Sequence, residues 1–290
     1  MTTISIENKY LSLELSPEMG GSVTKFNEKK TGREIFRSFP KDKKINKKNC
    51  YFASYFSTVP YFGVIQKKTF KFKDKYISLP KTHPLEPDTI HGEGWVSKWT
   101  VKNISNQTVD LFYIHNAKKG FPFKYKVYQK FSLNKKSLRI SIKIENLDNY
   151  PFECGIGFHP WFNISKISKI FINDFSYIKN SSTDYFTESK ITNKKHLDLN
   201  KQKIDETFLR WNGKSKLLIS KNIAIEIKNI KNINNLHVYT PPKENFFCIE
   251  PVTNISNAFK LKKLLNKKHG LKTLKPNKKF EAEVEFKLVS

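Results

Sequence analysis

The chain has 290 residues, of which 38% are hydrophobic and 14% aromatic, and this composition excludes a disordered protein because it supplies a sizeable core. The formal net charge is +27, but the lysines are spread over the whole length in turns between apolar stretches, so we expect no nucleic-acid partner. The three cysteines are widely spaced and form no Cys-x-x-Cys pair, which excludes a disulfide framework and a cysteine metal or redox motif.

The first segment alternates apolar and polar residues from Ile4 onward and lacks the continuous apolar stretch of a signal peptide. No apolar run approaches the roughly 18 residues that span a bilayer. We therefore expect a cytoplasmic protein without a membrane partner.

Alternation with a period of two, typical of half-buried strands, recurs along the whole sequence. It occupies residues 4–6, 11–15, 138–144, 223–227 and 280–286. Turn signals separate these runs and favour short connections between antiparallel strands. Residues 164–205 are polar and irregular and are expected to form long surface loops, whereas residues 256–268 are the best candidate helix. No repeat or linker divides the chain, so we predict one all-β domain over residues 1–290, built as a sandwich or large barrel.

Two of the seven histidines have unusual local sequences. His91 lies in the segment IHGEGW, where an apolar residue is followed by a glycine turn and then by Trp95. His159 lies in the apolar and aromatic segment 155–162 (GIGFHPWF). An imidazole titrates near neutrality, so such a residue suits a general acid. A core histidine with both ring nitrogens hydrogen-bonded is the alternative interpretation.

Glu250 is the carboxylate with the most unusual sequence context, because it interrupts the apolar run FFCI and precedes Pro251. Glutamate is rarely fully buried unless it is paired, and desolvation raises the pKa of a carboxyl toward that of a proton-shuttling partner. A salt bridge at a strand end is the alternative. The sequence has no phosphate-binding glycine loop, nucleophile elbow or His-Glu-x-x-His motif, so no metal site is expected.

Four stretches, taken in order, resemble the aldose 1-epimerase (galactose mutarotase-like) family over nearly the whole chain. They are residues 11–26 (LSLELSPEMGGSVTKF), 80–99 (PKTHPLEPDTIHGEGWVSKW), 155–162 (GIGFHPWF) and 246–258 (FFCIEPVTNISNA). A weaker match covers residues 204–208 (IDETF). The resemblance implies a β-supersandwich of the galactose mutarotase type, with a sugar in a groove across one curved sheet.

The resemblance also implies roles for individual residues. Glu250 would take the proton from the anomeric hydroxyl, and His159 would protonate the ring oxygen. The ring would open, the C1–C2 bond would rotate, and closure would give the opposite anomer without any cofactor. His91 would position the ring oxygen, Asp205 would accept hydrogen bonds from sugar hydroxyls, and Tyr61 would line the groove.

The sequence departs from the family's pattern at Gly63 and Val64, which stand where many members have an Asn-Arg pair. The missing arginine normally binds hydroxyls remote from the anomeric carbon. We therefore predict mutarotation of a free aldohexose, with a hexose-phosphate 1-epimerase or a non-catalytic carbohydrate-binding protein as alternatives. A third hypothesis, a nucleic-acid-binding protein, is supported by the net charge alone, and it predicts binding to DNA or RNA that depends steeply on salt concentration. Oligomeric state is not indicated by the sequence.

Overall fold

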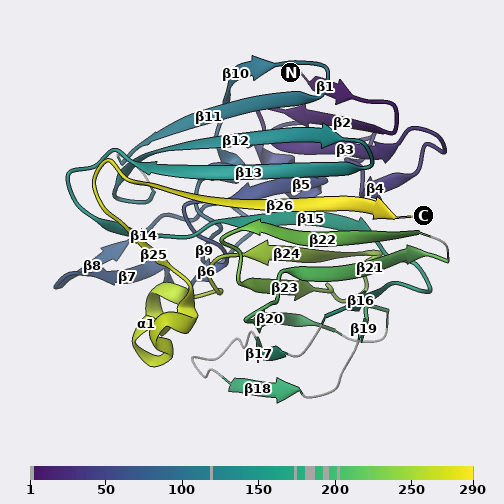
Figure 1. The fold of residues 1–290 in the computed structure, drawn as a ribbon. Coiled ribbons are helices and arrows are strands. Elements are labelled where there is room, and N and C mark those ends of the chain that lie inside the picture. The colour runs from purple at the N-terminus through teal and green to yellow at the C-terminus, as the bar shows by residue number, and fades with distance from the viewer. Residues whose placement is uncertain are drawn as a thin grey trace.

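The computed structural model describes residues 3–117, 120–172, 175–179, 187–191, 196–200, 203–221 and 223–289. These residues form two large antiparallel sheets that pack face to face, with short hairpins and one α-helix at one end (Figure 1). The arrangement confirms the predicted all-β sandwich. None of the helices in these described ranges combines the length and the apolar character needed to span a membrane.

The larger sheet has eleven strands within the described residues. In spatial order it contains β1 (Ile4–Glu7), β2 (Leu11–Ser16), β3 (Ser22–Glu28), β5 (Tyr55–Thr58), β15 (Gly157–Asn163), β24 (Phe246–Val252), β23 (Asn235–Tyr239), β20 (Asp205–Leu209), β17 (Phe175–Lys179) and β18 (Thr187–Ile191), while β4 (Glu34–Phe36) pairs with β3. Its central strands β5, β15, β24, β23 and β20 come from four distant parts of the sequence, so this sheet brings remote motifs together.

The smaller sheet has nine strands within the same ranges. In spatial order it contains β10 (Thr100–Ile104), β11 (Thr108–Asn116), β12 (Lys124–Asn134), β13 (Ser137–Asn146), β26 (Lys279–Val289), β22 (Ile223–Lys231), β21 (Lys214–Ser220), β16 (Lys169–Phe171) and β19 (Leu197–Asp198). The long strand β26 lies between β13 and β22, in the middle of the sheet (Figure 1).

Three two-stranded pairs and a few short helices complete the described structure. The pairs are β6 (Val64–Ile65) with β9 (Thr89–Ile90), β7 (Thr69–Phe72) with β8 (Lys75–Ser78), and β14 (Phe152–Cys154) with β25 (Lys272–Leu274). The α-helix is α1 (Ala258–Leu265), and 3₁₀ turns occupy Lys47–Phe52, Gln66–Lys68, Gly94–Val96 and Asn266–His269. Helix α1 confirms the helix expected within residues 256–268.

The core lies between the two sheets, where strand alternation turns one face of each strand inward. Phe36 on β4 shows this packing, because its ring contacts Phe286 of the opposite sheet at a centroid separation of 5.2 Å and Phe162 of its own sheet at 5.3 Å. Burial of each such side chain stabilises the fold by about 1.5–3 kcal/mol. Aromatic residues such as Phe36, Phe162 and Phe286 therefore help to hold the two sheets together.

The expectation of long loops over residues 164–205 is wrong for the described part of this segment. Strands β16, β17, β18 and β19 lie there. Strands at and near sheet edges need less apolar residue content than central strands, which explains why the polar sequence did not indicate them. Residues 173–174, 180–186, 192–195 and 201–202 of the same segment lie outside the described residues.

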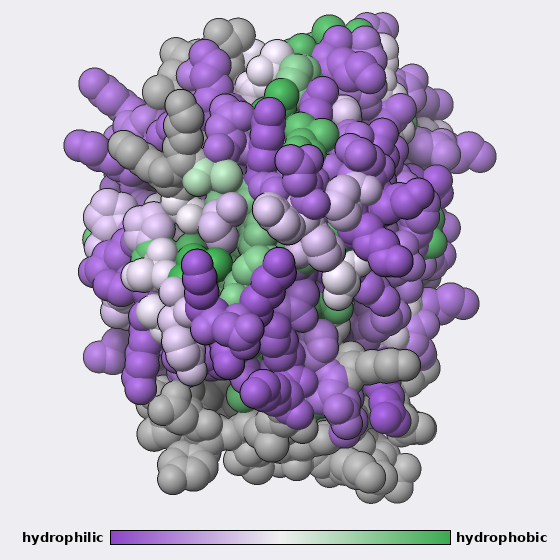
Figure 2. Space-filling model, turned by 90° about the vertical axis from the view of Figure 1, so that its left-hand side faces the viewer, coloured by the Kyte–Doolittle hydropathy of each residue, from purple (hydrophilic) through white to green (hydrophobic). Residues whose placement is uncertain are grey.

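One face of the molecule shows how the many charged residues are distributed. Hydrophilic residues cover most of that face, and hydrophobic residues appear only in small, interrupted patches between them (Figure 2). A formal charge of +27 is therefore compatible with lysines dispersed over a solvated surface, as their spread over the whole length of the sequence predicts.

Candidate active site

A cavity of about 520 Å³ opens on the face of the larger sheet that points away from the core. Its volume is in the range of pockets that hold small molecules. The described residues that line it are Tyr51, Phe62, Gly63, Val64, Leu85, Glu86, Ile90, His91, His159, Trp161, Asp205, His237, Tyr239, Pro241, Glu244, Phe246, Glu250 and Ser256. Four of the five residues expected from the sequence to form the site are among them.

Three of the lining residues, His159, Glu250 and His237, belong to a row of paired residues that runs across neighbouring strands. On β5 and β15, Phe56 is paired with His159, and on β24 and β23, Glu250 is paired with His237. Thr207 on β20 is paired in turn with His237. The register between β15 and β24, set by the pair of Trp161 with Cys248, places His159 opposite Glu250. Antiparallel pairing therefore brings together side chains that lie far apart in the sequence.

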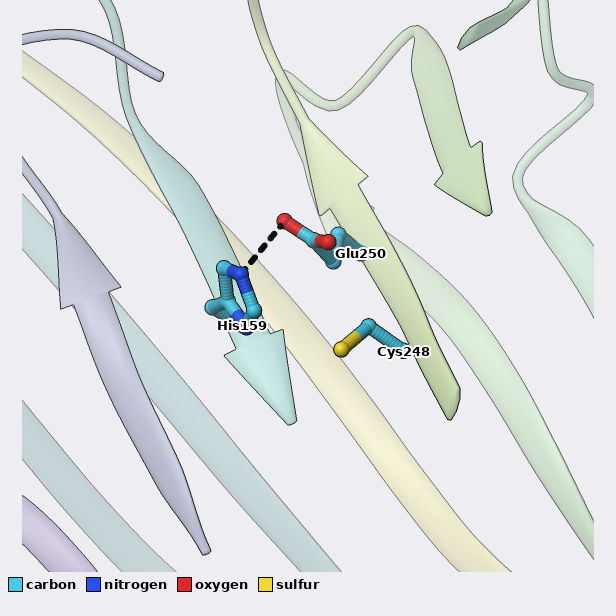
Figure 3. A group of neighbouring side chains, drawn as sticks. All are labelled: His159, Cys248 and Glu250. Carbon is cyan, nitrogen blue, oxygen red and sulfur yellow. Dashed lines mark ion pairs between the residues drawn. The ribbon is translucent and has the colours of Figure 1, made fainter. Parts of the chain in front are cut away.

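The His159 and Glu250 side chains meet inside this row (Figure 3). The Nε2 atom of His159 lies 3.4 Å from Oε2 of Glu250, and the two residues are only 5% and 2% exposed. Within the described part of the chain, His159 Nδ1 and Glu250 Oε2 have no hydrogen-bond partner. Buried polar atoms are nearly always satisfied, so unsatisfied atoms at a cavity floor indicate groups that a ligand would engage.

Burial controls the protonation of both groups. It lowers the pKa of His159 well below 6.5, with further lowering by the nearby His91 and His237. It raises the pKa of Glu250 well above 4.5, and the carboxylate of Asp205 adds to this increase. Desolvation disfavours the charged form of each group, so in the free site a proton shared by the pair resides on Glu250.

Aromatic side chains provide the desolvation around His159. Phe56 stacks on the imidazole with ring centroids 4.3 Å apart, and Trp161 lies at 4.9 Å. The guanidinium of Arg37 packs over the rings of Trp161 and Phe246, at 4.9 and 4.2 Å from their centroids, and stabilises this aromatic wall.

His91 lies in the cavity wall with its ring tautomer fixed by the backbone. The amide of Gly63 donates to Nδ1 of His91 at 3.1 Å, and the amide of His91 donates to the carbonyl of Gly63 at 2.9 Å. Burial and the nearby His237 lower the pKa of His91 to about 3, so the ring is neutral. Because Nδ1 accepts, the proton is on Nε2, and His91 is a hydrogen-bond donor toward a ligand.

His237 and Asp205 form a second polar pair beside Glu250. Nε2 of His237 lies 3.4 Å from Oδ1 of Asp205, and Nδ1 lies 2.9 Å from Oγ1 of Thr207. Burial lowers the pKa of His237, although Asp205 opposes this decrease. The Asp205 side chain is 49% exposed, so it reaches the open part of the cavity, where it can accept hydrogen bonds.

Gly63 and Val64 line the cavity where the family pattern has its Asn-Arg pair. Gly63 has φ of +78°, and a Cβ atom there would lie 2.5 Å from Cα of Ser256. The segment leading into α1 thus fills the space that a side chain at position 63 would need. Ser256 itself lines the cavity, and its hydroxyl accepts a hydrogen bond from the Val64 amide at 3.1 Å.

Tyr61 does not line the cavity, which corrects the expectation from the sequence. Its side chain is buried in the core, where its ring contacts Phe259 and its hydroxyl is hydrogen-bonded with Thr89 at 3.1 Å. The next residue, Phe62, lines the cavity instead. Consecutive residues here face opposite sides of the chain, and a sequence motif does not reveal which of two adjacent aromatic residues faces the ligand.

Sequence reasoning missed His237, which looked like an ordinary strand residue in NLHVYT. Strand alternation was the available signal, because it places His237 on the same face of its strand as Tyr239. On the neighbouring strand it places Glu250 on the same face as Cys248, and the two strands pair His237 with Glu250. Trp161 follows His159 by two positions and shares its face in the same way.

The cavity carries a charge opposite to that of the protein. Its described lining includes Glu86, Asp205, Glu244 and Glu250 but no lysine or arginine. Glu86 is oriented by the hydroxyl of Tyr51, which donates to it at 2.6 Å. The +27 net charge therefore does not come from the residues that would contact a ligand.

Solved structures with this architecture are galactose mutarotase-like proteins. A galactose mutarotase-like protein from Clostridium acetobutylicum superposes with a TM-score of 0.84 at 22% identity, over 99% of this chain and 94% of that one. Galactose 1-epimerase from Lactobacillus acidophilus NCFM gives a TM-score of 0.74 at 14% identity, over 99% and 93% of the two chains. The fold is thus a galactose mutarotase-like β-supersandwich.

Sequence comparison identifies the family within this fold class. The aldose 1-epimerase family profile matches residues 2–287, so the chain belongs to the aldose 1-epimerase family, a family of sugar isomerases. The uncharacterised protein YphB of Escherichia coli (strain K12) is 23% identical over 216 residues, which cover 70% of this chain and 73% of YphB.

Proposed function

We propose that the protein is a mutarotase that interconverts the α and β anomers of a free aldohexose such as glucose or galactose. The observation that carries this proposal is the 3.4 Å contact of His159 Nε2 with Glu250 Oε2 on the floor of the cavity. An acid and a base this close can engage the ring oxygen and the anomeric hydroxyl of one sugar at the same time. Membership of the aldose 1-epimerase family, matched over residues 2–287, supports the proposal and a single-domain organisation.

In this mechanism binding of the sugar moves the shared proton from Glu250, where it resides in the free site, to His159. Glu250 then removes the proton of the anomeric hydroxyl while His159 protonates the ring oxygen. The C1–O5 bond breaks, and C1 becomes the carbonyl carbon of the open-chain aldehyde. Glu250 is then protonated and His159 neutral, which is the charge-free arrangement that burial of the two groups favours. After rotation about C1–C2, the same transfers run in reverse and close the ring on the other face.

The surrounding residues hold the sugar for these transfers. His91 lines the cavity, and its Nε2–H group would donate to the ring oxygen or the anomeric oxygen. Asp205 accepts from hydroxyls further along the ring, in the region where the family's arginine is missing. The rings of Trp161 and Phe246 supply an apolar surface for the sugar's C–H groups.

Polarimetry or NMR exchange spectroscopy tests the proposal directly. A freshly dissolved single anomer of glucose or galactose should equilibrate faster with the protein than in buffer alone, in proportion to protein concentration. A protein that binds the sugar in titrations but does not accelerate the exchange would be the non-catalytic carbohydrate-binding protein.

The acidic cavity lining predicts discrimination against phosphorylated sugars. A phosphate group placed near Glu86, Asp205 or Glu244 would be repelled by about 1 kcal/mol per carboxylate at 4 Å in water, with no lysine or arginine among the described lining residues to offset it. We expect kcat/KM for a hexose 6-phosphate to be at least about tenfold lower than for the free hexose. NMR anomer exchange on both substrates measures the ratio. A preference for the phosphate would instead support a hexose-phosphate 1-epimerase.

The shifted pKa values predict the pH dependence of kcat/KM. The reactive pair carries one proton, so activity falls when the pair gains a second proton or loses its only one. The acid limb follows the pKa of His159, which burial places below 6.5, and the alkaline limb follows the pKa of Glu250, which burial places above 4.5. We therefore expect no loss of activity as the pH falls from 7 through 6.5.

The pH prediction is checked with initial rates corrected for uncatalysed exchange at each pH. An acid limb already centred at or above 6.5 would contradict it, because His159 would then behave as a solvated histidine.

A further inference from the structure

A cysteine adjoins the two groups of the proposed acid–base pair. Cys248 precedes Glu250 by two positions on β24, so both side chains lie on the same face of the strand and point toward His159 (Figure 3). One ligand atom from each residue, the imidazole nitrogen, the thiol sulfur and a carboxylate oxygen, lies within 4.8 Å of the other two. All three residues are buried.

The distances among these atoms fit a small metal ion. Bonds of Zn²⁺ to nitrogen, oxygen and sulfur are about 2.0–2.3 Å long, which puts tetrahedral ligand atoms roughly 3.3–3.7 Å apart. The contact of His159 with Glu250 at 3.4 Å already has this spacing. Since all three ligand atoms lie within 4.8 Å of one another, the sulfur of Cys248 has to approach the other two by at most about 1 Å.

A second observation also indicates a ligand. Oε2 of Glu250 has no hydrogen-bond partner among the described residues, although the residue is 98% buried, with 2% exposure. His159 and Glu250 both line the cavity, so an ion can reach them from solvent and keep its fourth position open toward the cavity. Three protein ligands and one open position are typical of accessible zinc sites.

We propose that His159, Cys248 and Glu250 form a binding site for Zn²⁺ or a similar thiophilic divalent ion. On binding, the thiol of Cys248 and the carboxyl of Glu250 lose any proton they carry to solvent, and no oxidation or reduction takes place. Nitrogen and thiolate ligands favour Zn²⁺ over Mg²⁺ or Ca²⁺. If the protein is a mutarotase as proposed above, the ion occupies both proton-transfer groups and inhibits the enzyme in competition with the sugar.

Cobalt substitution tests the site without any need for catalysis. Co²⁺ bound to the wild-type protein should give the thiolate-to-cobalt charge-transfer band and the ligand-field bands of tetrahedral coordination. The Cys248→Ser variant should lose the charge-transfer band. The matched control is Cys154→Ser, which removes another buried thiol, on β14, and should keep the band. Absence of the band in the wild type, or its persistence in Cys248→Ser, would overturn the proposal.

Zinc inhibition of anomer exchange is the second readout. We expect the Zn²⁺ concentration for half-inhibition to rise at least about tenfold in Cys248→Ser, while the rate without zinc stays within about threefold of the wild type. Circular dichroism establishes that the variant is folded, and Cys248→Ala replaces it if it is not. Equal zinc sensitivity of the variant and the wild type counts against the site. If the wild type does not accelerate exchange at all, the proposed function fails, and the cobalt spectrum alone decides the metal site.

Discussion

Replacement of Glu250 by glutamine should lower kcat for anomer exchange by about 10²–10⁴-fold, the contribution typical of a positioned general base. The substitution keeps the shape of the side chain but removes its basicity, and the buried position 250 admits little water to replace it, since the residue is only 2% exposed. KM should change little, because in the proposed complex the sugar would also contact His91, Asp205 and the aromatic wall, all of which line the cavity. Initial rates by polarimetry over a range of sugar concentrations separate kcat from KM.

Two further variants make this result specific. Asp205→Asn is the matched control, since its carboxylate also lines the cavity but is 49% exposed, and we expect it to raise KM more than it lowers kcat. The double variant His159→Gln with Glu250→Gln should be no slower than the slower single variant, because the two residues act as one unit. A kcat of Glu250→Gln close to that of the wild type would refute its role as the base.

Replacement of Gly92 by alanine should destabilise the protein by about 3 kcal/mol. Gly92 has φ of +63°, and a Cβ atom would lie 2.3 Å from the carbonyl oxygen of Val59. Left-handed backbone costs an alanine about 1–2 kcal/mol, and the contact with backbone forces a further displacement of the turn. Because Gly92 directly follows His91, the same displacement should lower kcat/KM. Urea unfolding measures the first effect and anomer exchange the second.

Gly32→Ala is the control for the Gly92 prediction. Gly32 has a similar φ of +69°, but no atom lies within 4 Å of the position of its Cβ. The Gly32→Ala substitution should lower the free energy of unfolding by only about 1 kcal/mol and leave activity unchanged. The difference between the two variants therefore isolates the effect of the close backbone contact at Gly92. Equal losses of stability would show that backbone conformation alone matters at position 92.

The architecture was accessible from the sequence because strand alternation is a local signal. The runs at residues 138–144, 223–227 and 280–286 became strands β13, β22 and β26. Polar residues interrupt the alternation in strands at and near a sheet edge, which is why the sequence predicts loops where the described part of residues 164–205 forms strands. The order of strands in each sheet, by contrast, is a property of long-range pairing that no local pattern contains.

The site was predictable only in part, for a related reason. His159 and Glu250 are 91 positions apart in the sequence, and strand register alone accounts for their contact. Cys248 gave no metal signal because its potential partner His159 comes from another strand rather than from a spaced motif. Tyr61 was assigned to the groove by its motif, but the structure buries it in the core and gives Phe62 that place.

The position of β26 in the middle of the smaller sheet has a consequence for biosynthesis. Strands β13 and β22 are both translated before residues 279–289, yet each pairs with β26. Until that strand emerges from the ribosome, β13 and β22 each present an open edge rich in apolar side chains, the kind of surface that invites pairing with other chains. The nascent protein should therefore depend on chaperones until residues 279–289 have been made, and its sandwich should close only after that.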